Sequence, residues 1–199
     1  MPYKIACVVE GHGDSEALPV VIRRIAASLN PACHVQSTAV IRTPKSKLLK
    51  SGELERAVEL AARRLLGFGG IFVVLDCDDD CPMLRGPELL ARATNARNDL
   101  PIAVVLAKRE FESWYIAAAE SLAGLAGFRP DMQSPFAPED IRGAKEWLSE
   151  MMETGRTYSA TVDQPRLANL FSIELAMRAP SFAKLHRDVG RVMSDLGQR

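Results

Sequence analysis

The chain has no excess charge of either sign, because 25 lysines and arginines balance 25 aspartates and glutamates. Net charge therefore favours neither a nucleic acid nor a membrane as partner, and any basic surface has to be local. No apolar run reaches the ~18 residues that could span a bilayer. Residues 1–4 lead straight into a short apolar segment, with none of the features of a signal peptide. We expect a cytoplasmic protein without a membrane partner.

Cysteine and histidine are too few and too scattered to predict a zinc site. Only Cys77 and Cys81 form a close pair, and neither a second pair nor spaced histidines follow. Cys7 and Cys33 lie in or beside apolar strands, where a free thiol behaves as a small hydrophobic group. We expect reduced thiols with structural roles. The phosphate-binding motif G-x4-G-K-[ST] is also missing, so the chain has no ATPase half of its own.

The apolar pattern predicts strands that alternate with helices of ten to fifteen residues. Such alternation is typical of right-handed βαβ units, which build a mostly parallel sheet covered by helices on both faces. The expected fold class is α/β, with a four-stranded sheet. The expected strands are residues 4–9, 35–41, 70–75 and 102–107, and the expected helices between them are residues 15–29, 53–66 and 87–97.

The character of the chain changes near residue 122. Glycines and prolines cluster between residues 124 and 138, and three further helices are expected at residues 139–152, 165–177 and 180–196. We interpret residues 1–121 as the α/β domain and residues 122–199 as a helical extension that packs on it. The two parts would form a single structural unit.

Acidic side chains follow three of the expected strands. Glu10 comes after the first, Asp76 and Asp78 after the third, and Glu110 and Glu112 after the fourth. Ligands of open parallel sheets bind outside the carboxyl ends of the strands, so these acids are expected to converge. Converging carboxylates must be protonated, solvated or joined by a cation, and hard oxygen ligands favour Mg²⁺ or Mn²⁺.

Local geometry supports a metal-binding role for the two aspartates that follow the third strand. The positions of the other acids also have simpler explanations. Residues two apart in extended backbone point the same way, so Asp76 and Asp78 can face one ion while Cys77 points inward. Asp14 would face that ion if the glycines at positions 11 and 13 allow a tight turn, but Asp14 or Ser15 can also simply cap the next helix. Acids that open a helix, such as Glu112, are also favoured by the helix dipole.

Short motifs in this order resemble a known domain. An apolar strand ending in Glu-Gly at residues 8–11 and another ending in Asp-Cys-Asp at residues 76–78 resemble the Toprim domain of topoisomerases, primases, recombination proteins and OLD-family nucleases. With Arg-Glu-Phe-Glu-Ser-Trp-Tyr at residues 109–115 and Pro-Ser-Phe at residues 180–182, the chain more narrowly resembles the bacterial DUF4276 family, which is assigned to the Toprim-like group. The resemblance covers nearly the full chain.

The resemblance implies roles for individual acids. Glu10 would act in acid–base chemistry or bind metal, and Asp76 and Asp78 would bind a divalent cation. As in OLD-type nucleases, Asp14 and Glu110 or Glu112 would complete a set able to hold two metals around a phosphodiester. The chain has no tyrosine placed as in a topoisomerase and no zinc module as in a primase, which leaves a stand-alone nuclease-like domain.

Basic residues near the acids are candidates for substrate contacts. Lys45 and Lys47 belong to the most basic local stretch, which is either a solvated loop or a phosphate-binding loop. Lys108, as a catalytic residue, and Arg109, as a substrate-binding one, could offset negative charge that develops on a phosphate. Ion pairs with the neighbouring acids are the alternative for both.

The expected function is that of a Mg²⁺- or Mn²⁺-dependent phosphodiesterase, a nuclease acting on DNA or RNA. The resembled family also implies a place in a phage-defence or mobile-element system with a separate ATPase partner. The main alternative is a subunit that has lost turnover and binds nucleic acid or an ATPase in a metal-dependent way. A third alternative is a hydrolase of small phosphate esters, which would use a metal site of the same kind.

Overall fold

A four-stranded parallel sheet forms the centre of the computed structural model, which describes residues 2–198. The strand order is β2-β1-β3-β4, and each neighbouring pair is parallel. The α/β class and the four-stranded sheet expected from the sequence are thereby confirmed. The strands are β1 (Tyr3–Val9), β2 (Val35–Arg42), β3 (Gly70–Asp76) and β4 (Ile102–Ala107).

Each central strand feeds two hydrophobic cores because its side chains alternate between the faces of the sheet. In β1, Ile5, Cys7 and Val9 enter one core, whereas Ala6 and Val8 enter the other. Both sets are fully buried, which explains why this strand reads as a continuous apolar run rather than an alternating one.

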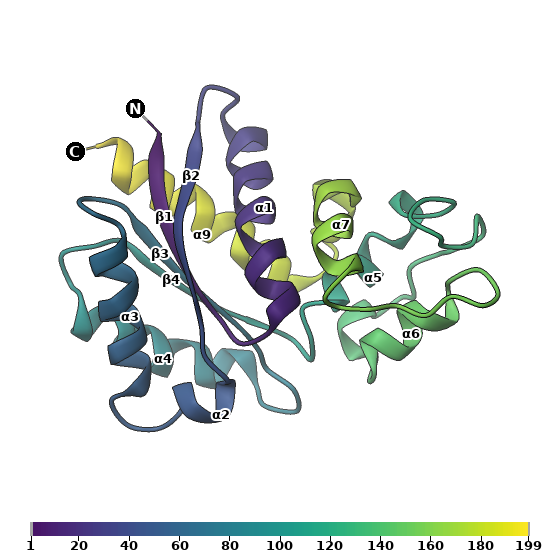
Figure 1. Ribbon diagram of the computed structural model, residues 1–199, viewed down its shortest axis with the longest axis horizontal. Coiled ribbons are helices and arrows are strands. Elements are labelled where there is room, and N and C mark those ends of the chain that lie inside the picture. Colours follow the sequence, from purple (N-terminus) through teal and green to yellow (C-terminus); the bar gives the residue numbers. More distant parts are fainter. Residues whose placement is uncertain (1, 199) are drawn as a thin grey trace.

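Four long helices cover the sheet, two on each face (Figure 1). Helices α1 and α9 lie over the first core, and α3 and α4 lie over the second. The pattern places these helices correctly, although α1 and α4 begin several residues earlier than expected. The bounds are α1 (His12–Leu29), α3 (Glu53–Arg64), α4 (Pro82–Ala96) and α9 (Pro180–Gly197). A short helix, α2 (Lys45–Leu48), occupies the expected basic loop.

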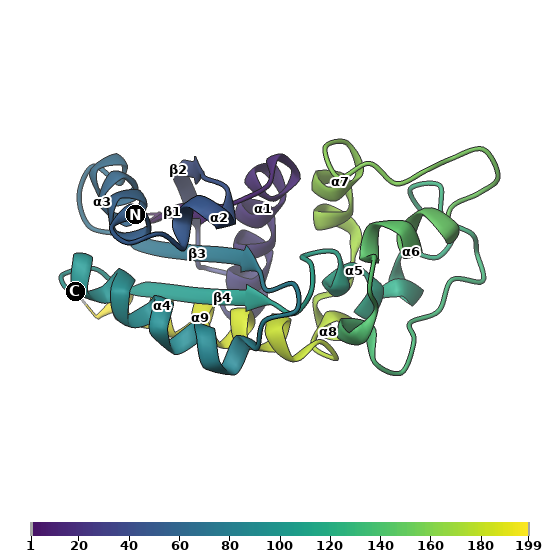
Figure 2. The same ribbon diagram turned by 90° about the horizontal axis from the view of Figure 1, so that it is seen from below.

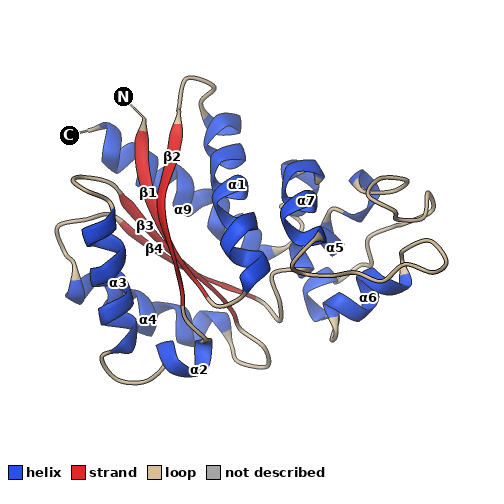
Figure 3. Cartoon of the chain, viewed as in Figure 1, coloured by secondary structure: helices blue, strands red, loops and turns tan. Residues whose placement is uncertain are grey.

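The remaining helices lie beyond the carboxyl ends of the strands, toward which β3 and β4 point in Figure 2. We call residues 119–178 the helical insert. Of the expected extension, only α9 lies on the sheet, as Figure 3 also shows. The expected helix at 165–177 is two helices. The first ends at Leu170, and Ser172 caps the second by accepting a hydrogen bond from the backbone N–H of Leu175. Helix α5 (Ser113–Ala117) leads into the insert, whose elements are η1 (Ala119–Ser121), η2 (Pro138–Asp140), α6 (Ala144–Glu150), α7 (Asp163–Leu170) and α8 (Ile173–Ala176).

A buried polar contact joins the insert to the start of α9. The Glu139 carboxylate accepts hydrogen bonds from the backbone N–H, at 2.9 Å, and the hydroxyl of Ser181. Trp114 Nε1 donates to the same hydroxyl at 2.8 Å, and the Trp114 ring packs edge-on against Phe182 at 5.4 Å between centroids. The Pro-Ser-Phe segment therefore has a structural role, in which it fixes where α9 returns to the sheet.

Gly13 marks a close approach between α1 and the insert. Neither Gly11 nor Gly13 has a positive φ, so the expected tight turn is not why they are glycine. A Cβ atom on Gly13 would collide with the Ala160 carbonyl oxygen and the Gln164 side chain. The glycine is needed for contact rather than for backbone conformation.

Replacing Gly13 by alanine is expected to destabilise the protein by about 2 kcal/mol, a typical cost of overpacking. Gly86, inside α4, is the matched control, because a Cβ atom there meets nothing within 4 Å. Gly86→Ala is expected to stabilise by up to ~1 kcal/mol through helix propensity. Urea unfolding of both variants measures the difference, and similar free energies of unfolding would contradict the contact at Gly13.

Candidate metal centre

The strand order creates a crevice at the carboxyl edge between β1 and β3. The chain leaves β1 toward β2 on one side and later returns to β3 on the other, which is the switch point where open α/β sheets bind ligands. Glu10 follows β1 and Asp76 ends β3. The backbone N–H of Asp76 donates to Glu10 Oε1 at 2.6 Å, so the two acids expected to converge lie side by side.

Asp76 is the electrostatic centre of the site. Burial raises its pKa well above the usual range, and the charges of Asp14, Glu112 and Glu10 raise it further, with Lys145 opposing them. Burial likewise raises the pKa of Glu10. Four carboxylates are therefore close enough to repel one another, a cost that a cation would remove.

Each central acid keeps one carboxylate oxygen for a further partner. Asp76 Oδ1 accepts from the backbone N–H of Phe111 at 2.8 Å, and Glu10 Oε1 accepts from Asp76. The other two oxygens, Asp76 Oδ2 and Glu10 Oε2, accept no hydrogen bond from residues 2–198. Their lone pairs are available to a cation.

Asp14 is a helix cap in this structure. It is 8% exposed, its Oδ2 accepts from the backbone N–H of Gly11 at 2.9 Å, and its Oδ1 accepts from Gln164 Nε2 at 2.5 Å. The capping alternative raised by the sequence is thus confirmed. Asp14 contributes charge to the site while both of its oxygens are engaged.

Glu110 and Glu112 are held by a lysine of the insert. Lys145 Nζ contacts Glu110 Oε2 and lies 3.4 Å from Glu112 Oε2. Glu112 is only 1% exposed, and its Oε1 accepts from the hydroxyl of Tyr158 at 3.1 Å. Burial by itself lowers the pKa of Lys145, but Glu112, Glu110 and Asp76 outweigh this effect and raise it. Lys145 acts as an internal counter-ion for the acids.

Asp78 and Arg109 adopt strained backbone conformations beside the acids. Both have positive φ, 50° and 67°, which is unusual for residues with a Cβ, and Asp78 N donates to Arg109 O at 3.0 Å. Each such residue costs on the order of 1–3 kcal/mol, and such strain concentrates at functional sites. The Asp78 carboxylate pairs with Lys45, whose Nζ lies 2.6 Å from Oδ2. Of the two loop lysines, Lys45 is thus the one brought to the site.

Two arginines line a cavity of about 270 Å³ together with the acids. Arg109 and Arg142 both pair with Asp79, with Arg142 Nη2 2.9 Å from Asp79 Oδ1. Arg142, foremost, lowers the pKa of Asp79, with Arg109 adding to the effect. The Nε atom of Arg109 is buried without a partner among the described residues. The cavity therefore combines acidic and basic side chains. It is lined by Asp76, Asp78, Asp79, Arg109, Glu110, Arg142, Gly143 and Lys145.

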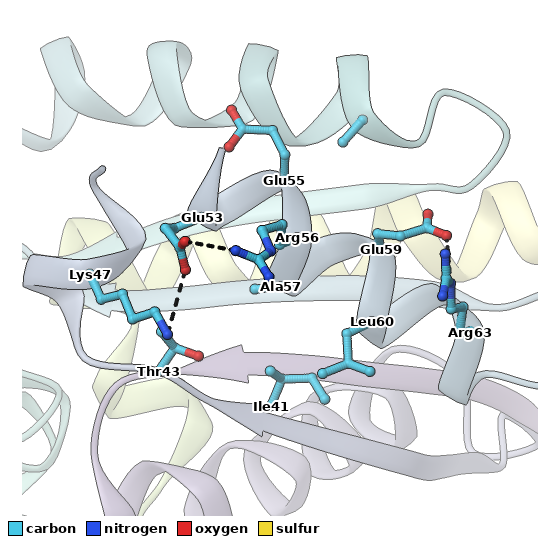
Figure 4. A pocket seen from close by; sticks show the side chains of 11 residues that line it. Ile41, Thr43, Lys47, Glu53, Glu55, Arg56, Ala57, Glu59, Leu60 and Arg63 are labelled. Atoms are coloured by element: carbon cyan, nitrogen blue, oxygen red, sulfur yellow. Dashed lines mark hydrogen bonds and ion pairs between the residues drawn. The ribbon is translucent and has the colours of Figure 1, made fainter. Parts of the chain in front are cut away.

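Two expected basic residues lie elsewhere. Lys108 is not among the residues that line this cavity and pairs with Asp140 at 2.5 Å. Lys47 lines a different, larger groove of about 680 Å³ between β2 and α3, where its Nζ lies 3.6 Å from Glu53 Oε2 (Figure 4). The acids of that groove are engaged in ion pairs, as Glu59 is with Arg63 at 2.8 Å and Glu55 is with Arg92 at 2.7 Å.

The site offers the type of donor atoms that a divalent cation needs, but the side chains that carry them are not arranged around a common point. Among residues 2–198, no three histidine, cysteine, aspartate or glutamate side chains are arranged to hold a metal ion. The oxygen donors of Glu10, Asp76 and Asp78 are of the type that Mg²⁺ and Mn²⁺ prefer. Their side chains, and those pinned by Lys145, would have to turn toward the ion.

The sequence did not reveal the partners that the insert supplies. Lys145, Arg142, Gln164 and Tyr158 all reach the acids from residues far along the chain. No local spacing connects them with the strand ends. The sequence contains one indirect indication. Buried acids need cationic or hydrogen-bonding partners, and residues 1–121 offer few near the strand ends.

A model of a protein family matches residues 9–190, most of the chain. By its fold and by the acids at the edge of its sheet, the chain is an α/β protein with a candidate cation site. The family whose model matches is described as a domain of unknown function, DUF4276. The chain belongs to this family, which confirms that part of the resemblance. No curated protein and no solved structure matches the chain. In residues 2–198, no helix is long and apolar enough to cross a membrane.

Proposed function

We propose that this protein is a Mg²⁺- or Mn²⁺-dependent phosphodiesterase that acts on nucleic acid and is related to Toprim domains. The observation that carries the proposal is the contact between Glu10 and Asp76 at the switch point, with Asp78 and two arginines in the adjoining cavity. The order of these acids at the strand ends is the order that Toprim domains use. The arginines supply the local positive field that the net charge of zero withholds.

The residues divide the chemistry between them. A divalent cation, when bound, would stabilise the charge on the attacking and leaving oxygens. Asp76 and Asp78 would hold it. Glu10, whose pKa is raised by burial, is suited to accept the proton that the attacking water loses. Arg109 and Arg142 can exchange Asp79 for a phosphate, to which guanidinium groups bind in a charge-assisted manner.

One observation favours a second candidate, a subunit that binds nucleic acid or an ATPase partner without turnover. Lys145 already neutralises Glu110 and Glu112, and no three acids are arranged for a metal ion among the residues described. A protein that never opens this arrangement would bind a phosphate through Arg109 and Arg142 and leave it intact.

A nicking assay on supercoiled plasmid with Mn²⁺ separates the two candidates. Glu10→Gln is expected to lower the rate by about 10²- to 10⁴-fold, the range of a general acid or base. Glu59→Gln is the control, because Glu59 pairs with Arg63 and Arg97 away from the acids. If wild type is inactive but still binds the plasmid DNA or an ATPase partner, the binding subunit is the better description.

A further inference from the structure

Two cysteines enclose the loop that follows β3. We call residues 77–81 the acid loop, because Cys77 and Cys81 stand at either end of three aspartates. Cys77 is 1% exposed, whereas Cys81 is exposed and directly precedes α4. The loop therefore combines one thiol that solvent can reach with one that is protected.

The backbone of the acid loop folds back on itself. Asp80 N donates to Cys77 O at 3.0 Å, and Cys77 Sγ lies 3.3 Å from Asp80 O. The carbonyl carbon of Asp80 is bonded to the nitrogen of Cys81, so the buried sulfur lies beside the backbone of the second cysteine. The turn spans residues 77–80 and brings the Cα atoms of Cys77 and Asp80 within ~7 Å, and Cys81 is the next residue along the chain. A disulfide needs Cα atoms about 4.4–6.8 Å apart, so a small movement of Cys81 is enough. Rotation of the exposed Cys81 side chain can bring the sulfurs together.

The surroundings of Cys77 restrict it to this one partner. The residue is 1% exposed, so solutes do not reach the sulfur directly. Its sulfur lies against the backbone of Asp80, so the partner that it can meet is an oxidised sulfur on the neighbouring Cys81. Cys7 is buried in the core on the opposite face of the sheet and does not compete.

Among the described residues, the backbone of the acid loop is hydrogen-bonded to β4 and the residues after it near its beginning, whereas its middle is held by the ion pairs of the Asp79 side chain. Cys77 N donates to Ala107 O at 2.8 Å and Asp78 N to Arg109 O at 3.0 Å. The Asp78 side chain pairs with Lys45 and has to turn from it to reach a cation. Closing the far end of the loop would remove the freedom that this movement needs.

We propose that Cys77 and Cys81 form a reversible disulfide when the protein meets a peroxide, and that the closed loop withholds Asp78 from a divalent cation. The effect on the cation rests on the proposed function, whereas the disulfide itself does not. The site is a covalent modification site that responds to oxidation.

The chemistry balances in two steps. The Cys81 sulfur attacks one oxygen of the peroxide, the O–O bond breaks, and a sulfenic acid and water are formed. The Cys77 sulfur then attacks the sulfenic sulfur, the S–O bond breaks, and a second water leaves with the thiol proton. Two thiols lose two electrons to the peroxide, and a reducing dithiol returns them.

The test treats the full chain with hydrogen peroxide and then alkylates the remaining thiols. Trypsin releases residues 65–85, which contain both cysteines, in one peptide. We expect this peptide to escape alkylation and to be lighter by two hydrogen atoms. In calorimetry the oxidised protein should bind Mn²⁺ at least tenfold more weakly, with recovery after dithiothreitol. Cys81→Ser should keep its affinity under peroxide, which controls for oxidation elsewhere, such as at the exposed Met83.

Each other outcome is decisive. A sulfinic acid at Cys81, or a disulfide between two chains, with Cys77 still alkylated would overturn the disulfide. An internal disulfide with unchanged Mn²⁺ affinity would overturn its effect on Asp78. Failure of the reduced protein to bind Mn²⁺ would contradict the proposed function instead, and the mass of the peptide would still decide the disulfide.

Discussion

Asp76→Asn is expected to abolish Mn²⁺ binding and, at the same time, to make the cation-free protein more stable. The carboxylate is buried among Glu10, Asp14 and Glu112, so neutralising it removes repulsion. Asparagine keeps an oxygen that can accept from the Phe111 N–H. We expect a rise in Tm of several degrees, since ~1 kcal/mol corresponds to about 2–4 °C in a protein of this size. Calorimetry and thermal unfolding with and without Mn²⁺ measure both effects.

The pH dependence provides an internal control for this variant. The folded protein raises the pKa of Asp76 above its unfolded value, so the native state binds the proton more tightly. This contribution to stability is fully present below the unfolded pKa, near 4, and is lost as pH rises through the folded pKa. The gain in Tm from Asp76→Asn should therefore be small in acid and grow toward neutral pH. A gain that is constant with pH, or a loss of stability at neutral pH, would contradict the electrostatic explanation.

Lys145→Met is expected to destabilise the cation-free protein by about 3 kcal/mol, because it leaves the buried charge of Glu112 without its counter-ion. Mn²⁺ should restore more stability to this variant than to wild type, since the acids would lose their internal competitor. Urea unfolding with and without Mn²⁺ measures both effects.

Two further variants make this prediction specific. Lys108→Met breaks an exposed ion pair with Asp140 and should cost less than ~1 kcal/mol. Adding Glu112→Gln to Lys145→Met removes the stranded charge and should recover most of the lost stability. Equal costs for the two lysines, or no recovery in the double variant, would show that Lys145 is not the counter-ion of Glu112.

The α/β layer could be predicted from the sequence because its signals are local. Strand β4 was placed at the correct residues, since a short apolar run between turn residues has a simple interpretation. The insert was harder to predict. Its helices are short, and their ends depend on contacts such as the one that Glu139 makes with Ser181, which no periodicity encodes.

The part of the candidate site that lies at the strand ends could be predicted, whereas the part that the insert supplies could not. Glu10 and Asp76 could be placed together because parallel strands deliver their carboxyl ends to one edge. That Lys145, rather than Lys108, faces the acids depends on how the insert folds back over residues that precede it by more than thirty positions. Spacing along the chain has no bearing on such a contact.

The return of α9 to the sheet has a consequence for synthesis of the protein. This helix covers β3 and β4 and packs against α1, so one hydrophobic core stays open until residues 180–197 have been made. Domains fold as units while the chain emerges, and exposed apolar surface at that stage promotes aggregation. A chain that has been made only up to residue 179 therefore exposes the apolar face that α9 covers, and we expect it to aggregate more readily than the chain that includes α9.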